Sequence, residues 1–277
     1  MLIKLTDKPT ILSHNIRPKI SPDDLSEPEF ITFRSGDRKA HAFYYAPKNF
    51  EGLPPLIVMT HGGPTSATTP TLDFKVQFWT SRGFAILDVD YTGSTGYGRS
   101  YRDALKGQWG LYDIADCEAG VQYLIDQKKV DPRRVAIRGG SAGGFTTLAA
   151  LTFGSKFSVG ASYYGISNLT TLAHETHKFE LKYLDSLIGA KNLYIQRSPL
   201  FNLDRFHAPV IFFQGAEDKV VPLSQAQVLF DALRKKGIPT ELVVYEGEQH
   251  GFRKSENIRD SLERELAFYL KVWSKLK

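Results

Sequence analysis

One glycine-rich segment in the middle of the chain constrains the fold more than any other feature. Residues 134–145 read RVAIRGGSAGGF: a short apolar strand runs into Gly139-x-Ser141-x-Gly143, and helix-forming residues follow. A sharp turn from strand to helix would expose the Ser141 hydroxyl, and only residues without bulky side chains allow so sharp a turn. The segment therefore predicts a nucleophilic serine, with an ordinary glycine-rich turn as the alternative.

The segments around this turn predict a mostly parallel sheet. Residues 29–34 and 41–46 alternate apolar and polar side chains on either side of SGDR, which predicts a β-hairpin. Further along the chain, short apolar runs alternate with helical patterns. We predict strands at 54–60, 84–89, 134–138, 159–164, 209–213 and 241–245, and helices at 74–82, 113–127, 146–151, 179–187, 224–234 and 255–276. This alternation favours a central sheet with helices on both faces.

The composition excludes several classes of protein. The chain has 277 residues, of which 42% are hydrophobic and 23% charged, enough for one large domain with a full core. The basic residues behind the net charge of +5 are scattered, so no nucleic-acid partner is expected. The longest apolar runs are too short to span a bilayer, so no membrane partner is expected. The single cysteine, Cys117, excludes an internal disulfide framework, and clustered metal ligands are absent. We expect a cytoplasmic protein with a buried thiol and without metal or cofactor.

A nucleophilic serine needs a base and a carboxylate that orients the base. Among seven histidines, His250 fits best, because it lies in a loop between the last predicted strand and the last predicted helix. His174 and His177 could instead line a pocket. Asp218 directly follows a buried strand, with Glu217 as its rival, and a helix-capping role is the alternative for Asp218. The order Ser, Asp, His along the chain is typical of the α/β-hydrolase fold.

The tetrahedral intermediate of such a reaction needs two N–H donors. The backbone N–H of Ala142 lies next to Ser141 at a predicted helix N-terminus, where N–H groups are free to bind an anion. The second donor should come from His61-Gly62-Gly63-Pro64, a turn after an early strand, and we assign it to the N–H of Gly63.

Six ordered motifs give this chain a specific resemblance that extends from about residue 29 to the C-terminus. They are HGGP at 61–64, YTGSTGYGR at 91–99, WGLYD at 109–113, GGSAGG at 139–144, GAEDKVVP at 215–222, and His250-Gly251. Together they resemble the prolyl oligopeptidase family, and within it the acylaminoacyl-peptidase and dipeptidyl-peptidase branches.

The resemblance implies a serine peptidase that cleaves short peptides through an acyl-enzyme, with Ser141, Asp218 and His250 as its catalytic triad. Phe179 and Tyr183, four residues apart on a predicted helix, are similar to an aromatic pair that lines the substrate pocket in the dipeptidyl branch. An aromatic core stripe is the alternative for that pair. We also assign His61 and Tyr91 to the substrate pocket.

The chain departs from the family in its N-terminal region. The family carries a large β-propeller before the catalytic domain, whereas only an irregular segment, residues 1–28, precedes the predicted catalytic domain at 29–277. That segment could be the remnant of a propeller linker. Without the propeller, aromatic segments near the site would be exposed, which allows a homo-oligomer. A carboxylesterase or other acyl hydrolase on the same fold is the main alternative function, followed by a non-catalytic binding module.

Overall fold

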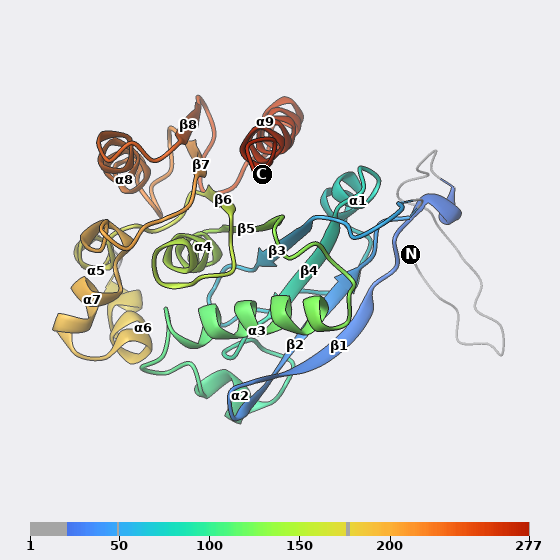
Figure 1. Cartoon of the computed structure of the whole chain (residues 1–277). Helices are drawn as coiled ribbons and strands as arrows, with labels where there is room; N and C mark the ends of the chain where they lie inside the picture. The colour runs from blue at the N-terminus through green and yellow to red at the C-terminus, as the bar shows by residue number, and fades with distance from the viewer. Residues whose placement is uncertain (1–20, 49, 176–177, 277) are drawn as a thin grey trace, which may run out of the picture.

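A twisted eight-stranded sheet runs through the molecule (Figure 1). The computed structural model describes residues 21–48, 50–175 and 178–276, apart from the side chains of residues 174–181. The strand order is β1-β2-β4-β3-β5-β6-β7-β8, and from β4 onward neighbouring strands are parallel. The strands are β1 (Glu29–Ser35), β2 (Arg38–Tyr45), β3 (Leu56–Thr60), β4 (Ala85–Asp90), β5 (Val135–Gly140), β6 (Val159–Tyr163), β7 (Val210–Gly215) and β8 (Thr240–Tyr245). The hairpin β1–β2 joins the parallel strands through an antiparallel pairing of β2 with β4.

Helices cover both faces of the sheet. They are α1 (Phe74–Thr80), α2 (Arg99–Asp103), α3 (Tyr112–Asp126), α4 (Ala142–Phe153), α5 (Leu169–Glu175), α6 (Lys178–Ile188), α7 (Lys191–Arg197), α8 (Leu223–Lys235) and α9 (Ser255–Trp273), with 3-10 turns at Pro22–Asp24 and Pro199–Phe201. Helices α3, α4 and α8 pack in one apolar cluster, whereas α1 and α9 pack in the other on the opposite face. The predicted α/β-hydrolase architecture, a mostly parallel sheet between two helical layers, is thereby confirmed.

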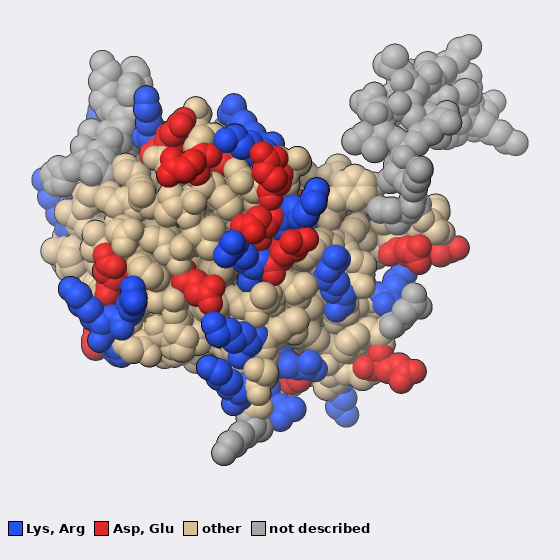
Figure 2. All heavy atoms as spheres, turned by 90° about the horizontal axis from the view of Figure 1, so that it is seen from above, with Lys and Arg blue, Asp and Glu red and all other residues tan. Residues whose placement is uncertain are grey.

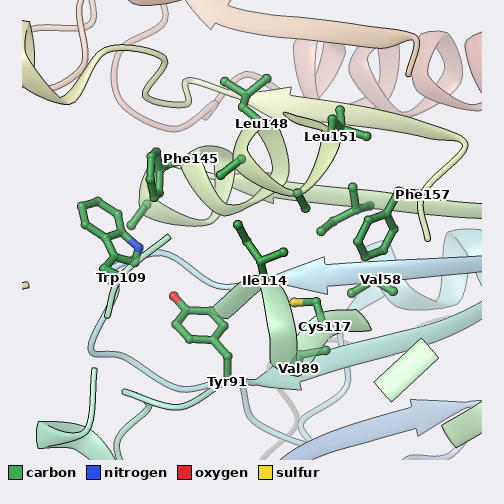
Figure 3. Packing of buried hydrophobic residues seen from close by; sticks show 14 of the residues in the cluster. Val58, Val89, Tyr91, Trp109, Ile114, Cys117, Phe145, Leu148, Leu151 and Phe157 are labelled. Atoms are coloured by element: carbon green, nitrogen blue, oxygen red, sulfur yellow. The ribbon is translucent and has the colours of Figure 1, made fainter. Parts of the chain in front are cut away.

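Strand β3 is almost entirely apolar because both of its faces are covered. Leu56, Ile57 and Val58 of β3 are all fully buried. Neighbouring side chains along the strand reach different clusters: Val58 packs toward α3 and α4, and Ile57 toward α1 and α9. Cys117 on α3 is fully buried near Val58 and Ile114 (Figure 3), which confirms the prediction of a buried thiol.

The structure also contains helices that the pattern did not predict. The short helices α2, α5 and α7 have five or seven residues each, too few for an apolar period to stand out. Of the predicted irregular segment 1–28, residues 1–20 lie outside the described part of the chain. No helix in the described part is long and apolar enough to cross a membrane. On the face seen in Figure 2, basic and acidic side chains are interspersed.

Candidate active site

Ser141 occupies the turn between β5 and α4 in a strained backbone conformation. Its φ is 57° and its ψ −121°, a region that residues with a side chain rarely adopt. A Cβ atom at Gly139 or Gly143 would overlap atoms of Thr60, so the absence of side chains lets α4 approach β3 this closely. The Thr60 hydroxyl lies 2.9 Å from the carbonyl oxygen of Gly143 and ties the two elements together.

His250 and Asp218 extend from neighbouring loops to meet this serine. His250 Nε2 lies 2.8 Å from Ser141 Oγ, and His250 Nδ1 lies 2.8 Å from Asp218 Oδ2. Since a carboxylate can only accept a hydrogen bond, the Nδ1–H group donates to Asp218 and Nε2 is left to accept from the Ser141 hydroxyl. This arrangement can remove a proton from the serine hydroxyl.

Asp218 is held in place independently of His250. Its side chain is fully buried, and Oδ1 accepts hydrogen bonds from the backbone N–H groups of Val220 and Val221, both at 2.9 Å. The amide of Gln214 lies 3.2 Å from Oδ2. Glu217, the rival carboxylate, is exposed. Of the two, Asp218 is the one that meets the imidazole.

A small apolar cavity of about 130 Å³ opens beside Ser141. Both residues assigned as N–H donors, Gly63 and Ala142, lie on its wall, as does Tyr183. The remaining walls come from residues to which the sequence analysis gave no role: Pro64, Trp109, Ile166, Leu172, Leu184, Val220 and Val221. We call this space the acyl cavity. Phe179 lies among the residues whose side chains are outside the description, as do His174 and His177.

His61 and Tyr91 are not among the described residues that line the acyl cavity, so their assignment to the substrate pocket stays a prediction. Tyr91 is fully buried, and its hydroxyl donates to the backbone oxygen of His61 at 3.0 Å. Figure 3 shows its ring pointing into the core toward Ile114 and Trp109. The imidazole of His61 stacks on this ring with a centroid distance of 4.3 Å. Each of these residues directly follows a strand, and that position in the sequence does not indicate the direction of its side chain.

His61 instead stabilises the turn that contains Gly63. Its Nδ1 lies 2.7 Å from the carbonyl oxygen of Gly62, and its Nε2 lies 2.7 Å from Ser94 Oγ. A neutral ring with its proton on Nδ1 donates to the Gly62 oxygen, and its Nε2 accepts from the Ser94 hydroxyl when that hydroxyl turns away from the carbonyl oxygen of Tyr91, which also lies 2.7 Å from it. Because the C=O and the following N–H of a trans peptide point in opposite directions, holding the Gly62 oxygen also fixes the direction of the Gly63 N–H.

Asp113 is a second residue that stabilises the loops around the site. It belongs to the motif at 109–113, but the sequence alone indicated no role for it. Its fully buried carboxylate accepts from the Gly110 N–H at 2.7 Å and from the Thr146 hydroxyl at 2.6 Å. Burial raises the pKa of Asp113 to about 6. The carboxylate thereby links the loop of Trp109, on the wall of the acyl cavity, to α4. No group of three or more His, Cys, Asp or Glu residues suited to a metal ion occurs in the described residues.

The buried His61 gives a testable dependence of stability on pH. Burial lowers the pKa of His61 to about 4, whereas an exposed histidine in the unfolded chain titrates near 6.5. The unfolded state therefore binds the proton more tightly, and the folded state loses stability as the pH falls from about 6.5 toward 4. We expect this residue to account for about 3 kcal/mol of that loss. Urea unfolding at several pH values should show a weaker loss in His61→Gln.

His207 offers the matched control for this measurement, because it is an exposed histidine. His207→Gln should retain the dependence of the parent chain. An equal loss of stability in the parent chain and in His61→Gln would contradict the assignment of a neutral buried ring.

Comparisons with known proteins place this chain among peptidases. The model of the prolyl oligopeptidase family matches residues 70–275. Dipeptidyl aminopeptidase BIII of Pseudoxanthomonas mexicana is 31% identical over 87% of this chain and 38% of its own length. The acylamino-acid-releasing enzyme of Rattus norvegicus is 28% identical over 75% of this chain and 30% of its own. A solved puromycin-hydrolyzing peptidase of Mycobacterium tuberculosis is 43% identical with a TM-score of 0.92, over 97% of this chain and 42% of that one. The chain thus spans roughly two fifths or less of the length of these relatives.

Proposed function

The chain belongs to the prolyl oligopeptidase family, and we propose from this premise that it is a serine peptidase that hydrolyses short peptides, of the acylaminoacyl-peptidase or dipeptidyl-/aminopeptidase type. The observation that carries the proposal is the pair of 2.8 Å contacts that connect Ser141, His250 and Asp218 beside an apolar cavity. The names of the relatives, which refer to dipeptidyl, acylamino-acid and puromycin substrates, support small amide substrates.

In the proposed first step, Ser141 Oγ attacks the carbonyl carbon of the scissile amide while His250 Nε2 takes the hydroxyl proton. Asp218 holds the ring in the required tautomer and stabilises the imidazolium that forms. The negative charge that develops on the substrate oxygen is stabilised by the N–H groups of Gly63 and Ala142, both on the wall of the acyl cavity. His61 assists indirectly by fixing the peptide that ends in the Gly63 N–H.

In the proposed second step, the C–N bond breaks and His250 returns its proton to the departing amine, which leaves an ester of the acyl group on Ser141. A water molecule then attacks the ester with His250 again as base, and the free serine is regenerated. The acyl residue would rest in the acyl cavity, where Trp109, Leu172 and Tyr183 favour an apolar or aromatic side chain.

A carboxylesterase would use the same groups, since ester and amide hydrolysis share the tetrahedral chemistry. The deciding test compares a peptide p-nitroanilide with a p-nitrophenyl ester of the same acyl group. We expect a peptidase to cleave both substrates, with Ser141→Ala as the background for each. Steady cleavage of the ester, with no release of p-nitroaniline even at high enzyme concentration, would favour the esterase.

A further inference from the structure

A second cavity lies next to Ser141, separate from the acyl cavity. It measures about 380 Å³, and none of its lining residues lines the acyl cavity. Its lining includes Gly140 and Gly251, the chain neighbours of Ser141 and His250, together with Lys75 of α1 and Leu262 of α9. Tyr164, also on its wall, packs edge-on against the His250 ring with a centroid distance of 4.9 Å. The reacting groups therefore lie between two cavities.

A buried arginine, Arg138 of β5, lies on the wall of this second cavity. It is only 6% exposed, and its Nε lies 2.9 Å from an oxygen of the fully buried Glu265. The guanidinium also packs over the ring of Tyr163, at 4.9 Å from the ring centroid. Glu265 also accepts hydrogen bonds from the hydroxyls of Tyr163 at 2.6 Å and Tyr269 at 2.8 Å.

The Arg138 guanidinium has donors left over. A guanidinium has five N–H groups, and buried donors in proteins are nearly always paired. Its Nε makes the ion pair with Glu265 but no well-aligned hydrogen bond. The Tyr163 hydroxyl also interacts with the guanidinium, which leaves other N–H groups of Arg138 available to a ligand in the cavity. The other cation on the wall, Lys75, is exposed at the rim. The nearby carboxylate of Asp73 accepts from the backbone N–H of Lys75 at 2.7 Å.

We propose that this second cavity binds the leaving group of the substrate, and that Arg138, assisted by Lys75, holds a free C-terminal carboxylate on that leaving group. The inference rests on the proposed function, in which the acyl residue fills the other cavity. A planar guanidinium on the cavity wall matches the two oxygens of a carboxylate. When the C–N bond breaks, the new amine takes its proton from His250, and its carboxylate end would remain on Arg138 until release.

The spacing along β5 indicates the length of leaving group that fits. Arg138 precedes Ser141 by three residues, which corresponds to roughly 10 Å along an extended strand. Two extended residues span about 7 Å, and the arginine side chain covers part of the remaining distance. We therefore expect a leaving group of two residues to place its carboxylate near the guanidinium.

The test uses two substrates that differ only at the end of the leaving group: acetyl-Phe-Gly-Gly with a free carboxylate, and the same peptide with a C-terminal carboxamide. We expect kcat/KM to be about tenfold higher for the carboxylate, as hydrogen bonds to a charged group allow. In the double variant Arg138→Gln/Glu265→Gln, which removes the buried pair together and leaves no unpaired charge, the ratio should fall to about one.

A second variant does not depend on replacing a buried pair. Because Lys75 is exposed, Lys75→Met should fold normally and lower the ratio about threefold. The matched control is Lys219→Met, since Lys219 lines a different hollow beside His250 together with Gln249 and Arg253. Lys219→Met should keep the ratio of the parent chain.

The outcomes of this experiment separate failure of the leaving-group inference from failure of the proposed function. Cleavage of both peptides at equal kcat/KM by the parent chain would overturn the inference while leaving the proposed function standing. Loss of the preference in Lys219→Met alone would place the leaving group in the hollow that Lys219 lines and would also overturn it. Failure to cleave either peptide, together with absent fluorophosphonate labelling of Ser141, would overturn the proposed function itself.

Discussion

Replacing Ser141 with alanine is expected to abolish covalent labelling by fluorophosphonates and to lower kcat by about 10⁴-fold or more. The reason is geometric: Ser141 Oγ lies 2.8 Å from His250 Nε2, so its hydroxyl is the one in position to lose a proton and attack a carbonyl or a phosphonate. Intact-mass analysis after exposure to the reagent measures the first effect, and p-nitroanilide hydrolysis measures the second.

The control for this variant is a serine of the same chain that lies on the surface. Ser155 is exposed at the turn after α4, where its backbone N–H and hydroxyl contact Glu118. Ser155→Ala should be labelled as fully as the parent chain. Equal labelling of Ser141→Ala and the parent chain would show that another residue is the nucleophile.

Replacing Asp218 with asparagine should lower kcat by up to about 10⁴-fold and leave the fold intact. Asp218 Oδ2 accepts the Nδ1–H of His250 at 2.8 Å, which keeps Nε2 free to take the serine proton. An asparagine that presents its NH₂ group would favour the opposite tautomer, with the proton on Nε2. Circular dichroism and thermal unfolding test the fold, and kcat tests the tautomer.

The neighbouring carboxylate provides the matched comparison. Glu217 is exposed and next to Asp218 in the chain, so Glu217→Gln makes the same change of charge with no contact to the ring. We expect it to retain nearly full activity. If Glu217→Gln were the damaging change and Asp218→Asn were active, the carboxylate assigned to His250 would be wrong.

The predictable parts of the fold are those in which burial produces a recognisable pattern of apolar residues in the sequence. Strands β3 and β7 are covered on both faces, so they appear as unbroken apolar runs ahead of glycine-rich or polar loops. Long helices such as α3 and α9 show an apolar period. The short α5 and α7 do not, because seven residues give barely two turns and their packing depends on partners far along the chain.

The same reasoning explains which parts of the site the sequence could indicate. Ser141, Asp218 and His250 each follow a strand, and the carboxyl ends of parallel strands meet at one edge of the sheet. The direction of a side chain within a loop has no such rule, so the sequence does not indicate that His61 and Tyr91 stack on each other beside the turn of Gly62. The pairing of Arg138 with Glu265 joins β5 to α9 across the interior, and no spacing in the sequence indicates it.

The absence of side chains around Ser141 has a consequence for how such a protein can change over evolutionary time. Gly139 and Gly143 admit no larger residue without displacing Thr60, so we expect substitutions at these two positions to be rejected. The walls of the acyl cavity, in contrast, come from separate segments, such as the loop of Trp109 and helices α5 and α6 around Leu172 and Leu184, which hold neither His250 nor Asp218. Substitutions in these segments can therefore change the preference for one acyl residue over another while the reacting groups keep their positions.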